Sequence, residues 1–246
     1  MRVAGMSDRG RVREKNEDGY LLFREGPFSL FAVADGMGGH AAGEVASTLA
    51  LQLLRAYLLE HGGELLAKPA ALRYLTVFVE EMLAFVNLKV VDEALLNEMR
   101  AGMGTTLTML LGANGLWCLG HIGDSRAYLV NGNGLYQLTE DHTLVTQMIR
   151  SGQLCGAETE AHPQRHVLTR ALGTDEKAAF DILPQSFRMG DMVLLCSDGL
   201  YGLVDDAEIS ATVRAESDPQ IALERLIGRA NERGGTDNIT AVLVCL

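Results

Sequence analysis

The chain has 246 residues, of which 48% are hydrophobic and 22% charged, proportions that fit a folded protein and not a disordered one. It carries 32 acidic against 21 basic residues, a formal net charge of −11. That charge disfavours nucleic acid and anionic membranes as partners, because phosphate-rich surfaces require a basic protein. The four scattered cysteines form no CxxC pair, and no apolar segment resembles a signal peptide or a membrane span. We therefore expect a cytoplasmic protein in a reducing compartment.

The first predicted elements are one strand and two helices. An apolar run over residues 28–34 ends at Asp35-Gly36 and predicts a short buried strand. Good helix formers dominate residues 41–60, where steps of four residues predict a core-facing stripe of Val45, Leu49, Leu53 and Tyr57. Gly62-Gly63 is expected to end this helix. A second helix begins near Pro69, and its predicted core stripe is Leu75, Val79, Met82, Val86 and Val90.

The hydrophobic period becomes strand-like after residue 104. Apolar runs at 105–111, 116–122, 126–130 and 135–138 are separated by turns rich in glycine and asparagine, which predicts antiparallel hairpins. Further strands are expected at 180–183, 192–196 and 239–244, and helices at 206–215 and 219–231. Helices grouped early and late around a run of hairpins indicate an α+β fold with antiparallel sheet. No linker or repeat divides the chain, so we expect a single domain over residues 1–246.

The acidic residues at the edges of the apolar runs are the most informative feature. They are Asp18, Asp35, Asp124, Asp198 and Asp237. If these strand ends converge, the crowded negative charges require neutralising cations. Oxygen ligands without histidine or cysteine favour Mg²⁺ or Mn²⁺, and several carboxylates with bridging water suit two ions about 3.5–4 Å apart. Taken singly, each aspartate is equally an ordinary turn former, so only convergence distinguishes the two interpretations.

Arg13 precedes Asp18 in a stretch of mixed charge. A lone guanidinium beside a metal site can bind two phosphate oxygens, and the alternative is a surface ion pair. The basic residues of this stretch alternate with acidic ones, which argues against a nucleic-acid patch: Arg9, Arg11, Arg13 and Lys15. The glycine-rich strings at 36–39 and 102–106 match neither a P-loop nor a dinucleotide-binding turn.

Eight motifs cover nearly the whole chain. In order, they are VREKNEDGY (12–20), FAVADGMGGHAAGEVAS (31–47), GMGTTL (102–107), GDSRAYL (123–129), LTEDHT (138–143), LTRALG (168–173), LLCSDGL (194–200) and GGTDNITAVLV (234–244). Each is weak alone, but together the chain resembles the bacterial metal-dependent Ser/Thr protein phosphatases, the PPM or type 2C family. The resemblance implies a central antiparallel β-sandwich with helices on both outer faces, in four αββα layers.

The resemblance also implies roles for individual residues. Asp35 would bridge two metals, with Asp198 and Asp237 completing the first site, and Asp18 with the main-chain carbonyl of Gly36 would hold the second. Asp124, together with Asp198, would hold a weaker third metal. Arg13 would bind the phosphate. The implied cofactors are Mn²⁺ or Mg²⁺, and the implied reaction is direct attack by a metal-bridging hydroxide on phosphoserine or phosphothreonine in proteins, reversing a cognate Ser/Thr kinase.

Three points stay open at this level. The general acid is either His40 or a metal-bound water, since Met37 occupies the place where many eukaryotic members have histidine. Residues 142–166 resemble the family's mobile flap beside the active site, with a plain surface loop as the alternative. A phosphatase-like binding or scaffolding domain without turnover is the alternative function, which the presence of all five acids and Arg13 disfavours. A different phosphoesterase, acting on small molecules or nucleic acid, is disfavoured by the motifs and the net charge.

Overall fold

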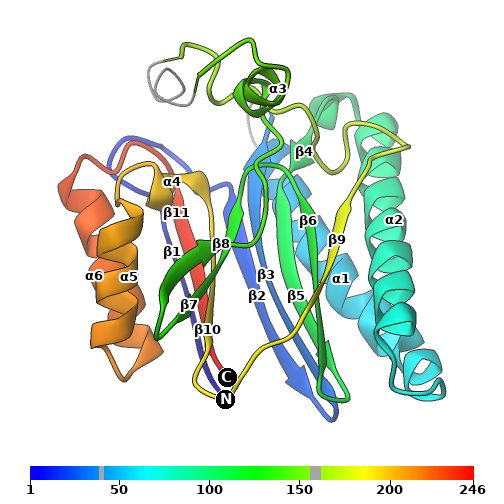
Figure 1. The fold of residues 1–246 in the computed structure, drawn as a ribbon. Coiled ribbons are helices and arrows are strands. Elements are labelled where there is room, and N and C mark those ends of the chain that lie inside the picture. Colours follow the sequence, from blue (N-terminus) through cyan, green and yellow to red (C-terminus); the bar gives the residue numbers. More distant parts are fainter. Residues whose placement is uncertain (39–41, 156–161) are drawn as a thin grey trace.

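The computed structural model describes residues 1–38, 42–155 and 162–246. Two antiparallel sheets pack face to face and helices cover both outer faces, which confirms the four-layer prediction (Figure 1). In the described part of the chain, none of the helices combines the length and apolar character that crossing a bilayer requires.

Each sheet takes strands from distant parts of the chain. The first has the order β1-β11-β10-β7-β8 and contains β1 (Arg2–Asp8), β7 (Arg126–Asn131), β8 (Gly134–Gln137), β10 (Met192–Cys196) and β11 (Ile239–Cys245). The second has the order β2-β3-β5-β6-β9, with β4 paired to β3, and contains β2 (Asp18–Glu25), β3 (Phe28–Met37), β4 (Gly104–Thr105), β5 (Leu107–Ala113), β6 (Leu116–Ile122) and β9 (Asp181–Gln185).

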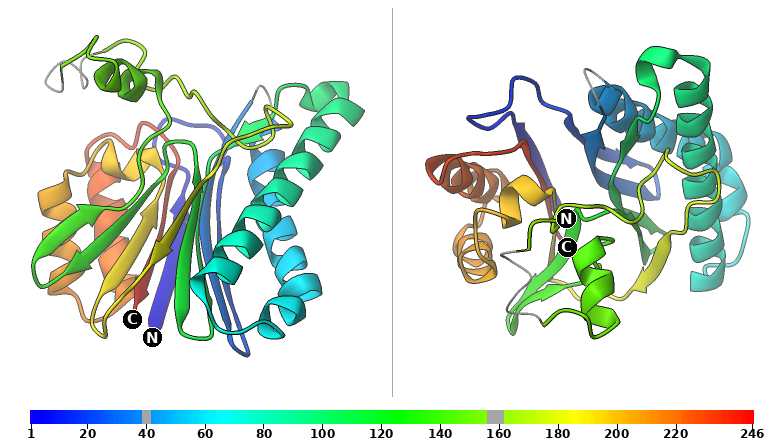
Figure 2. Two further views of the ribbon diagram at one scale, coloured as in Figure 1. Left: turned by 45° about the vertical axis from the view of Figure 1, so that its right-hand side comes forward. Right: turned by 90° about the horizontal axis from the view of Figure 1, so that it is seen from above.

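The long helices are divided between the two sheets. Helices α1 (Ala42–Leu66) and α2 (Leu72–Leu96) cover the second sheet, and α5 (Asp206–Ala215) and α6 (Pro219–Glu232) cover the first (Figure 2). Three short helices complete the described elements: η1 (Glu98–Arg100), α3 (Leu144–Arg150) and α4 (Asp198–Tyr201). Helix α3 lies above the end of the sandwich that is remote from both termini (Figure 1).

Three clusters of apolar side chains hold the two sheets and the covering helices together. The core between the sheets is mainly aliphatic but includes an aromatic ring, with Phe31, Leu110, Leu195 and Val242 all fully buried. A larger cluster joins the second sheet to α1 and α2, and another joins the first sheet to α5 and α6. Alternate residues of central strands therefore serve two different cores, which is why these strands consist of continuous apolar runs.

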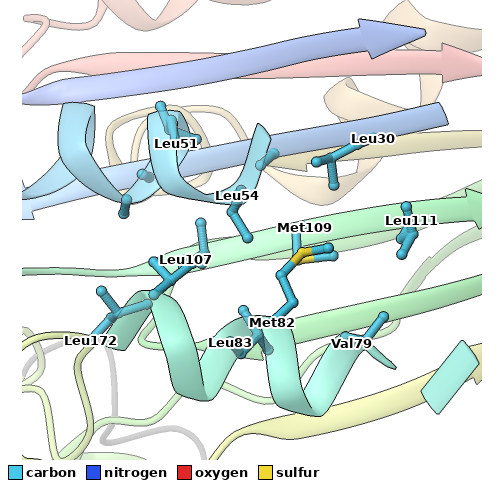
Figure 3. Packing of buried hydrophobic residues seen from close by; sticks show 14 of the residues in the cluster. Leu30, Leu51, Leu54, Val79, Met82, Leu83, Leu107, Met109, Leu111 and Leu172 are labelled. Atoms are coloured by element: carbon cyan, nitrogen blue, oxygen red, sulfur yellow. The ribbon is translucent and has the colours of Figure 1, made fainter. Parts of the chain in front are cut away.

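The predicted face of the first helix is shifted by one residue. Val45, Leu49, Leu53 and Tyr57 are only half-buried, and the ring of Tyr57 lies 5.5 Å from Phe78 of α2. The residues that bury fully against the sheet are Ala46, Ala50, Leu54 and Leu58. The helix has two contact faces, and the sequence stripe that we identified is the one toward α2. The stripe predicted for α2 is confirmed, and Figure 3 shows Val79 and Met82 in the same core as Leu54.

The predicted end of the first helix is wrong. Helix α1 continues through Gly62-Gly63 to Leu66. A Cβ atom at Gly62 would lie 2.8 Å from the ring of Phe28, so the missing side chain lets the helix pack closely on the sheet. Tertiary packing here outweighs the low helix propensity of glycine.

Candidate active site

Strand register gathers the aspartates at one edge of the sandwich. Asp18 and Asp35 are direct cross-strand partners in the β2–β3 pair. Asp124 lies in the turn between β6 and β7, Asp198 follows β10, and Asp237 precedes β11. Because the strands are antiparallel, these ends all meet at the edge below α3 (Figure 1). The predicted convergence is therefore confirmed, although no single motif contains more than one of these five positions.

The converging residues border an open cavity of about 1110 Å³. Asp35, Asp124, Asp198 and Asp237 line it directly, and Asp18 lies beside Asp35. In the described part of the chain, no three acidic, histidine or cysteine side chains form a closed ligand set around one point. The aspartates instead surround a basin that is wide enough for ions together with water.

Burial and mutual repulsion raise the pKa of three of these carboxylates, those of Asp18, Asp35 and Asp124. Burial is the main cause that raises the pKa of Asp18 to about 7, and the charges of Asp198 and Asp237 add to it. Burial followed by the charge of Asp198 raises the pKa of Asp124 to about 7 as well. The pKa of Asp35 is raised well above its usual value by burial and then by Asp18, Asp198, Asp124 and Asp237. A cation in the basin would relieve all of these effects.

Two orphaned oxygen atoms show that the basin fits a hard cation. Within the described residues, Asp18 Oδ1 and Asp198 Oδ1 are buried without a hydrogen-bond partner. The other oxygen of Asp18 accepts a hydrogen bond from Ser197 Oγ at 2.7 Å, which fixes the carboxylate across the two sheets. A buried carboxylate oxygen without a donor is costly, and an all-oxygen donor set is the kind that Mg²⁺ and Mn²⁺ prefer.

Gly36 brings its backbone to the edge of the same cavity. A Cβ atom at this position would lie 2.1 Å from the carbonyl oxygen of Gly43 and 2.7 Å from that of Glu17, so no other residue fits. Its amide donates to the Glu17 carbonyl at 3.2 Å. The chain thus passes close to the basin, and the Gly36 carbonyl as a metal ligand stays a prediction.

Hydroxyl groups connect the turns that carry Asp35 and Asp124. The Asp35 amide donates to Thr106 Oγ1 at 3.0 Å, and Thr106 Oγ1 lies 2.7 Å from Ser125 Oγ. Thr105 Oγ1 donates to the Asp35 carbonyl at 2.9 Å. These contacts fix the backbone on both sides of the basin, which explains the two threonines of the GMGTTL motif.

Side chains from two later segments hold the turn of Asp124. The Tyr201 hydroxyl donates to the Asp124 carbonyl at 2.9 Å. His142 accepts from the Gly123 amide at 3.1 Å, and its own amide donates to the Gly123 carbonyl at 2.8 Å. The ring of Tyr201 lies 3.6 Å from the guanidinium of Arg126. Neither Tyr201 nor His142 was predicted from the sequence to hold this turn, although each lies inside or next to one of the eight motifs.

Arg126 in turn is held by a bidentate ion pair. Its Nε lies 3.0 Å from Asp141 Oδ1, and its Nη2 lies 2.7 Å from Oδ2 of the same residue. Its third nitrogen donates to the buried Tyr128 hydroxyl at 2.9 Å. Planar recognition of this kind fixes the guanidinium, so the Tyr201 ring packs against a rigid surface.

Arg13 lies at the rim of the cavity, which it lines. Its Nη2 donates to Asp237 Oδ2 at 2.8 Å, and 54% of its side chain is exposed. The predicted ion pair and the predicted approach to the metal site therefore coincide. The Asp237 carboxylate raises the pKa of Arg13 above its usual value, so the guanidinium is a permanent cation facing the basin.

Comparison with known proteins agrees with this geometry. Residues 9–243 match the family described as Protein phosphatase 2C. The chain belongs to the protein phosphatase 2C family. The serine/threonine phosphatase stp of Listeria innocua is 36% identical over 239 residues, which cover 97% of this chain and 93% of that protein. The serine/threonine protein phosphatase PstP of Mycobacterium tuberculosis is 40% identical over 247 residues, 99% of this chain and 44% of PstP.

Solved structures support the same assignment. The catalytic domain of PstP in complex with two manganese ions superposes with a TM-score of 0.80 and 36% identity, covering 98% of this chain and 96% of that one. The present protein is a protein-serine/threonine phosphatase of a metal-dependent, manganese-binding family. This agrees with the resemblance found in the sequence.

Two residues from a later segment also border the phosphatase site. Arg165 and His166, from the predicted flap at 142–166, line the cavity. His166 Nδ1 lies 3.7 Å from Asp198 Oδ2, and this carboxylate raises the pKa of His166. Sequence reasoning gave His166 no role, because nothing in its surroundings indicates Asp198 as a neighbour. His40, the candidate general acid, lies outside the described residues, as do residues 156–161 of the flap.

Proposed function

We propose that this phosphatase hydrolyses phosphoserine and phosphothreonine in proteins by a single direct displacement at phosphorus. Two divalent cations would be held by Asp18, Asp35, Asp198 and Asp237. A weaker third cation would be held by Asp124 together with Asp198. The observation that carries the proposal is the pair of buried, unpartnered oxygens on Asp18 and Asp198 beside carboxylates of raised pKa. When bound, Mn²⁺ or Mg²⁺ supplies an activated water and neutralises charge on the phosphoryl group.

Residues of this chain bind the phosphate and hold the turns of the site in place. Arg13 binds two phosphate oxygens at the rim, and its contact with Asp237 holds the guanidinium toward the basin. Thr106, Ser125 and Tyr201 keep the ligand-bearing turns in place before the substrate arrives. Preorganised charges of this kind act on the transition state without a cost of reorganisation. The departing serine or threonine oxygen takes a proton from His40 or from water.

The first test is turnover. With Mn²⁺ the purified protein should release phosphate from p-nitrophenyl phosphate and from a phosphothreonine peptide, and a chelator should abolish both reactions. Asp35→Asn should lower kcat by about 100-fold or more, because it removes a ligand shared by two ions. Asp124→Ala should cost much less, because its ion is the weakest. If Mn²⁺ binds and no phosphate is released, the alternative of a binding domain without turnover holds.

The second test concerns the number of displacements. A single in-line displacement inverts the configuration at phosphorus, whereas a covalent phosphoenzyme gives retention. A phosphate ester made chiral with oxygen isotopes and sulfur distinguishes these outcomes, and retention would refute the direct mechanism.

We also propose that the substrates are products of one Ser/Thr kinase of the same cell. Comparing the phosphoproteomes of phosphatase-deletion and kinase-deletion strains tests this pairing, because the same sites should change in opposite directions.

A further inference from the structure

A basic loop stands beside the catalytic cavity of this acidic protein. Residues 9–15 hold four basic side chains against one acidic side chain, a local charge of +3 in a chain of −11, so the rest of the molecule carries −14. The four basic residues, all exposed, are Arg9, Arg11, Arg13 and Lys15. The proposed reaction uses only Arg13, which leaves three cations of this loop without a role.

The three remaining cations are available to a partner. Arg13 pairs with Asp237, whereas within the described residues no ion pair involves Arg9, Arg11 or Lys15. The Arg9 side chain donates to the main-chain carbonyl of Glu14 at 3.3 Å. The charge of Lys15 also acts on Glu17, so Arg9 and Arg11 are the cations best placed to bind an anionic partner.

The loop is fixed against the wall of the cavity. Buried Asn238 donates from Nδ2 to the carbonyls of Arg9 at 2.9 Å and Lys15 at 2.8 Å, which closes the loop at both ends. Its Oδ1 accepts from the Glu17 amide at 2.8 Å. Asn238, Glu17 and Arg13 of the loop line the cavity, so the loop is anchored beside it.

Arg11 is anchored to the segment that precedes Asp237. Its amide donates to the Gly235 carbonyl at 2.7 Å, and a Cβ atom at Gly235 would lie 2.9 Å from Arg11 Cγ. The side chain of Arg11 therefore starts against Gly235, next to Thr236, which lines the cavity. The loop and residues 235–238 lie together at the edge of the sandwich that carries the site (Figure 2).

We propose that this loop is a docking surface for acidic residues that flank the phosphorylated serine or threonine of the substrate. The inference rests on the proposed function, because it places the phosphate at Arg13. An extended peptide advances about 3.3 Å per residue, so side chains two to four positions from the phosphoresidue lie roughly 7–13 Å away, within reach of long basic side chains around Arg13. Charge complementarity of this kind selects partners more than it tightens binding.

The test compares two phosphothreonine peptides that differ only in their flanks, one with glutamates and one with lysines. The variants are Arg9→Gln/Arg11→Gln and, as a control with the same change of net charge, Arg24→Gln/Lys68→Gln. Arg24 lies opposite Ser29 at the other end of the hairpin that pairs Asp18 with Asp35, and Lys68 is an exposed residue between α1 and α2. The wild type should prefer the acidic peptide in kcat/KM.

In Arg9→Gln/Arg11→Gln that preference should fall by about 3- to 10-fold, as expected for two exposed charge contacts. It should fall to a similar extent in the wild type at high salt, because exposed charges are screened. Hydrolysis of p-nitrophenyl phosphate, which has no flanks, should stay unchanged in both double variants. An unaltered preference in Arg9→Gln/Arg11→Gln, or an equal loss in the control, would overturn the proposal.

Peptide binding separates this inference from the proposed function. Fluorescence anisotropy at low salt measures the affinity of both peptides whether or not turnover occurs. Tighter binding of the acidic peptide that depends on Arg9 and Arg11 supports the docking surface even if p-nitrophenyl phosphate is not hydrolysed, an outcome that would instead refute the catalytic proposal. Equal affinity for both peptides refutes the surface alone. A single-stranded oligonucleotide that binds the loop more tightly than the acidic peptide would also refute it.

Discussion

Single atoms at the rim of the cavity fix the orientation of Arg13. Asp237 contacts Arg13 through one oxygen, and its other oxygen accepts from the Asn238 amide at 2.8 Å. One carboxylate therefore orients Arg13, the proposed phosphate-binding residue, while it remains within reach of the basin. An exposed ion pair contributes little to stability, on the order of 0–1 kcal/mol, so the value of this contact lies in orientation.

Arg13→Ala should raise KM strongly with a smaller change in kcat, because the guanidinium contacts phosphate already in the ground state. The Tm should change little, because the pair is exposed. Steady-state kinetics with a phosphothreonine peptide measure both constants, and Arg13→Lys serves as the control that keeps the charge without the bidentate geometry. A defect confined to kcat would instead assign Arg13 to the transition state or to assembly of the metal site.

Tyr201→Phe tests whether the hydrogen bond from the Tyr201 hydroxyl to the Asp124 carbonyl is needed to position Asp124. The change removes one hydroxyl and leaves the ring on Arg126, so the buried Asp124 carbonyl loses its donor. The free energy of unfolding should fall by about 1–2 kcal/mol. The affinity of the weakest Mn²⁺ site, measured by a binding titration, should fall by about 10-fold, because losses in the outer shell of a metal site weaken metal binding.

Tyr136→Phe is the matched control for this prediction. It makes the same chemical change on an exposed hairpin, where the hydroxyl only donates to the Asn133 carbonyl at 3.4 Å. Its stability and its Mn²⁺ affinity should match the wild type. If Tyr201→Phe also keeps the Mn²⁺ affinity of the wild type, the hydroxyl has no part in positioning Asp124.

At the scale of elements, helix α1 serves two partners at once. Leu54 is fully buried among residues of the sheet and α2, whereas Leu53 is half-buried on the side toward α2. The sheet beneath α1 contains β3, which ends in Asp35 and Gly36. Packing of this helix therefore supports the strand that carries Asp35, the proposed ligand of two metal ions.

Leu54→Ala should lower the free energy of unfolding by about 2–5 kcal/mol, because it leaves a cavity in a close-packed core. For a chain of this length that corresponds to a fall in Tm of roughly 5–15 °C. Leu53→Ala should cost less than half as much, since its side chain is already partly in water. Thermal melts of the two variants show which substitution lowers the Tm more. Equal losses would support the buried face that the sequence predicted.

At the scale of the molecule, the two sheets force like charges together. Asp18 and Asp35 belong to one sheet, whereas Asp198 and Asp237 flank strands of the other. Folding therefore brings together carboxylates that the unfolded chain keeps apart in water. Cations that bind only the folded state should stabilise the whole protein.

Saturating Mn²⁺ should raise the Tm by several degrees. Free metal at a hundredfold excess over Kd adds about 2.7 kcal/mol, and one kcal/mol moves the Tm of such a chain by roughly 2–4 °C. The shift should shrink in Asp35→Asn and persist in Asp124→Ala. Thermal melts with chelator and with Mn²⁺ measure this shift in each protein. An unchanged shift in Asp35→Asn would mean that the converging aspartates do not share a site.

The Mn²⁺ shift should also grow with pH. Asp18 and Asp124 have folded pKa values of about 7, above the ordinary value of 3.8. The folded state keeps these protons longer than the unfolded chain does, so their contribution to stability is complete below pH 4 and is lost as the pH rises through 7. Protons compete with metal over the same range. The rise in Tm should therefore be larger at pH 8 than at pH 5.5, and a shift independent of pH would contradict the raised pKa values.

Local patterns in the sequence determined most elements and the kind of chemistry. The strands at 105–111, 116–122 and 239–244, the helices at 206–215 and 219–231, and the stripe of α2 follow from hydrophobic period and turn residues. Strands β1 and β2 were not predicted because both are edge strands: β1 pairs with β11 from the other end of the chain, and β2 pairs with β3, the next strand. The mixed polarity of β2 gives no clear period.

Only the tertiary structure decided which residues act together. The sequence placed the five aspartates at strand ends, and motif order indicated a phosphatase, but register and sheet packing bring Asp18 opposite Asp35 and the end of β10 beside them. His166 and Tyr201 join the site only through contacts between segments distant in the chain. The physical reason is that periodicity records which side of an element is buried, whereas the neighbours on that side depend on how the sheets are stacked.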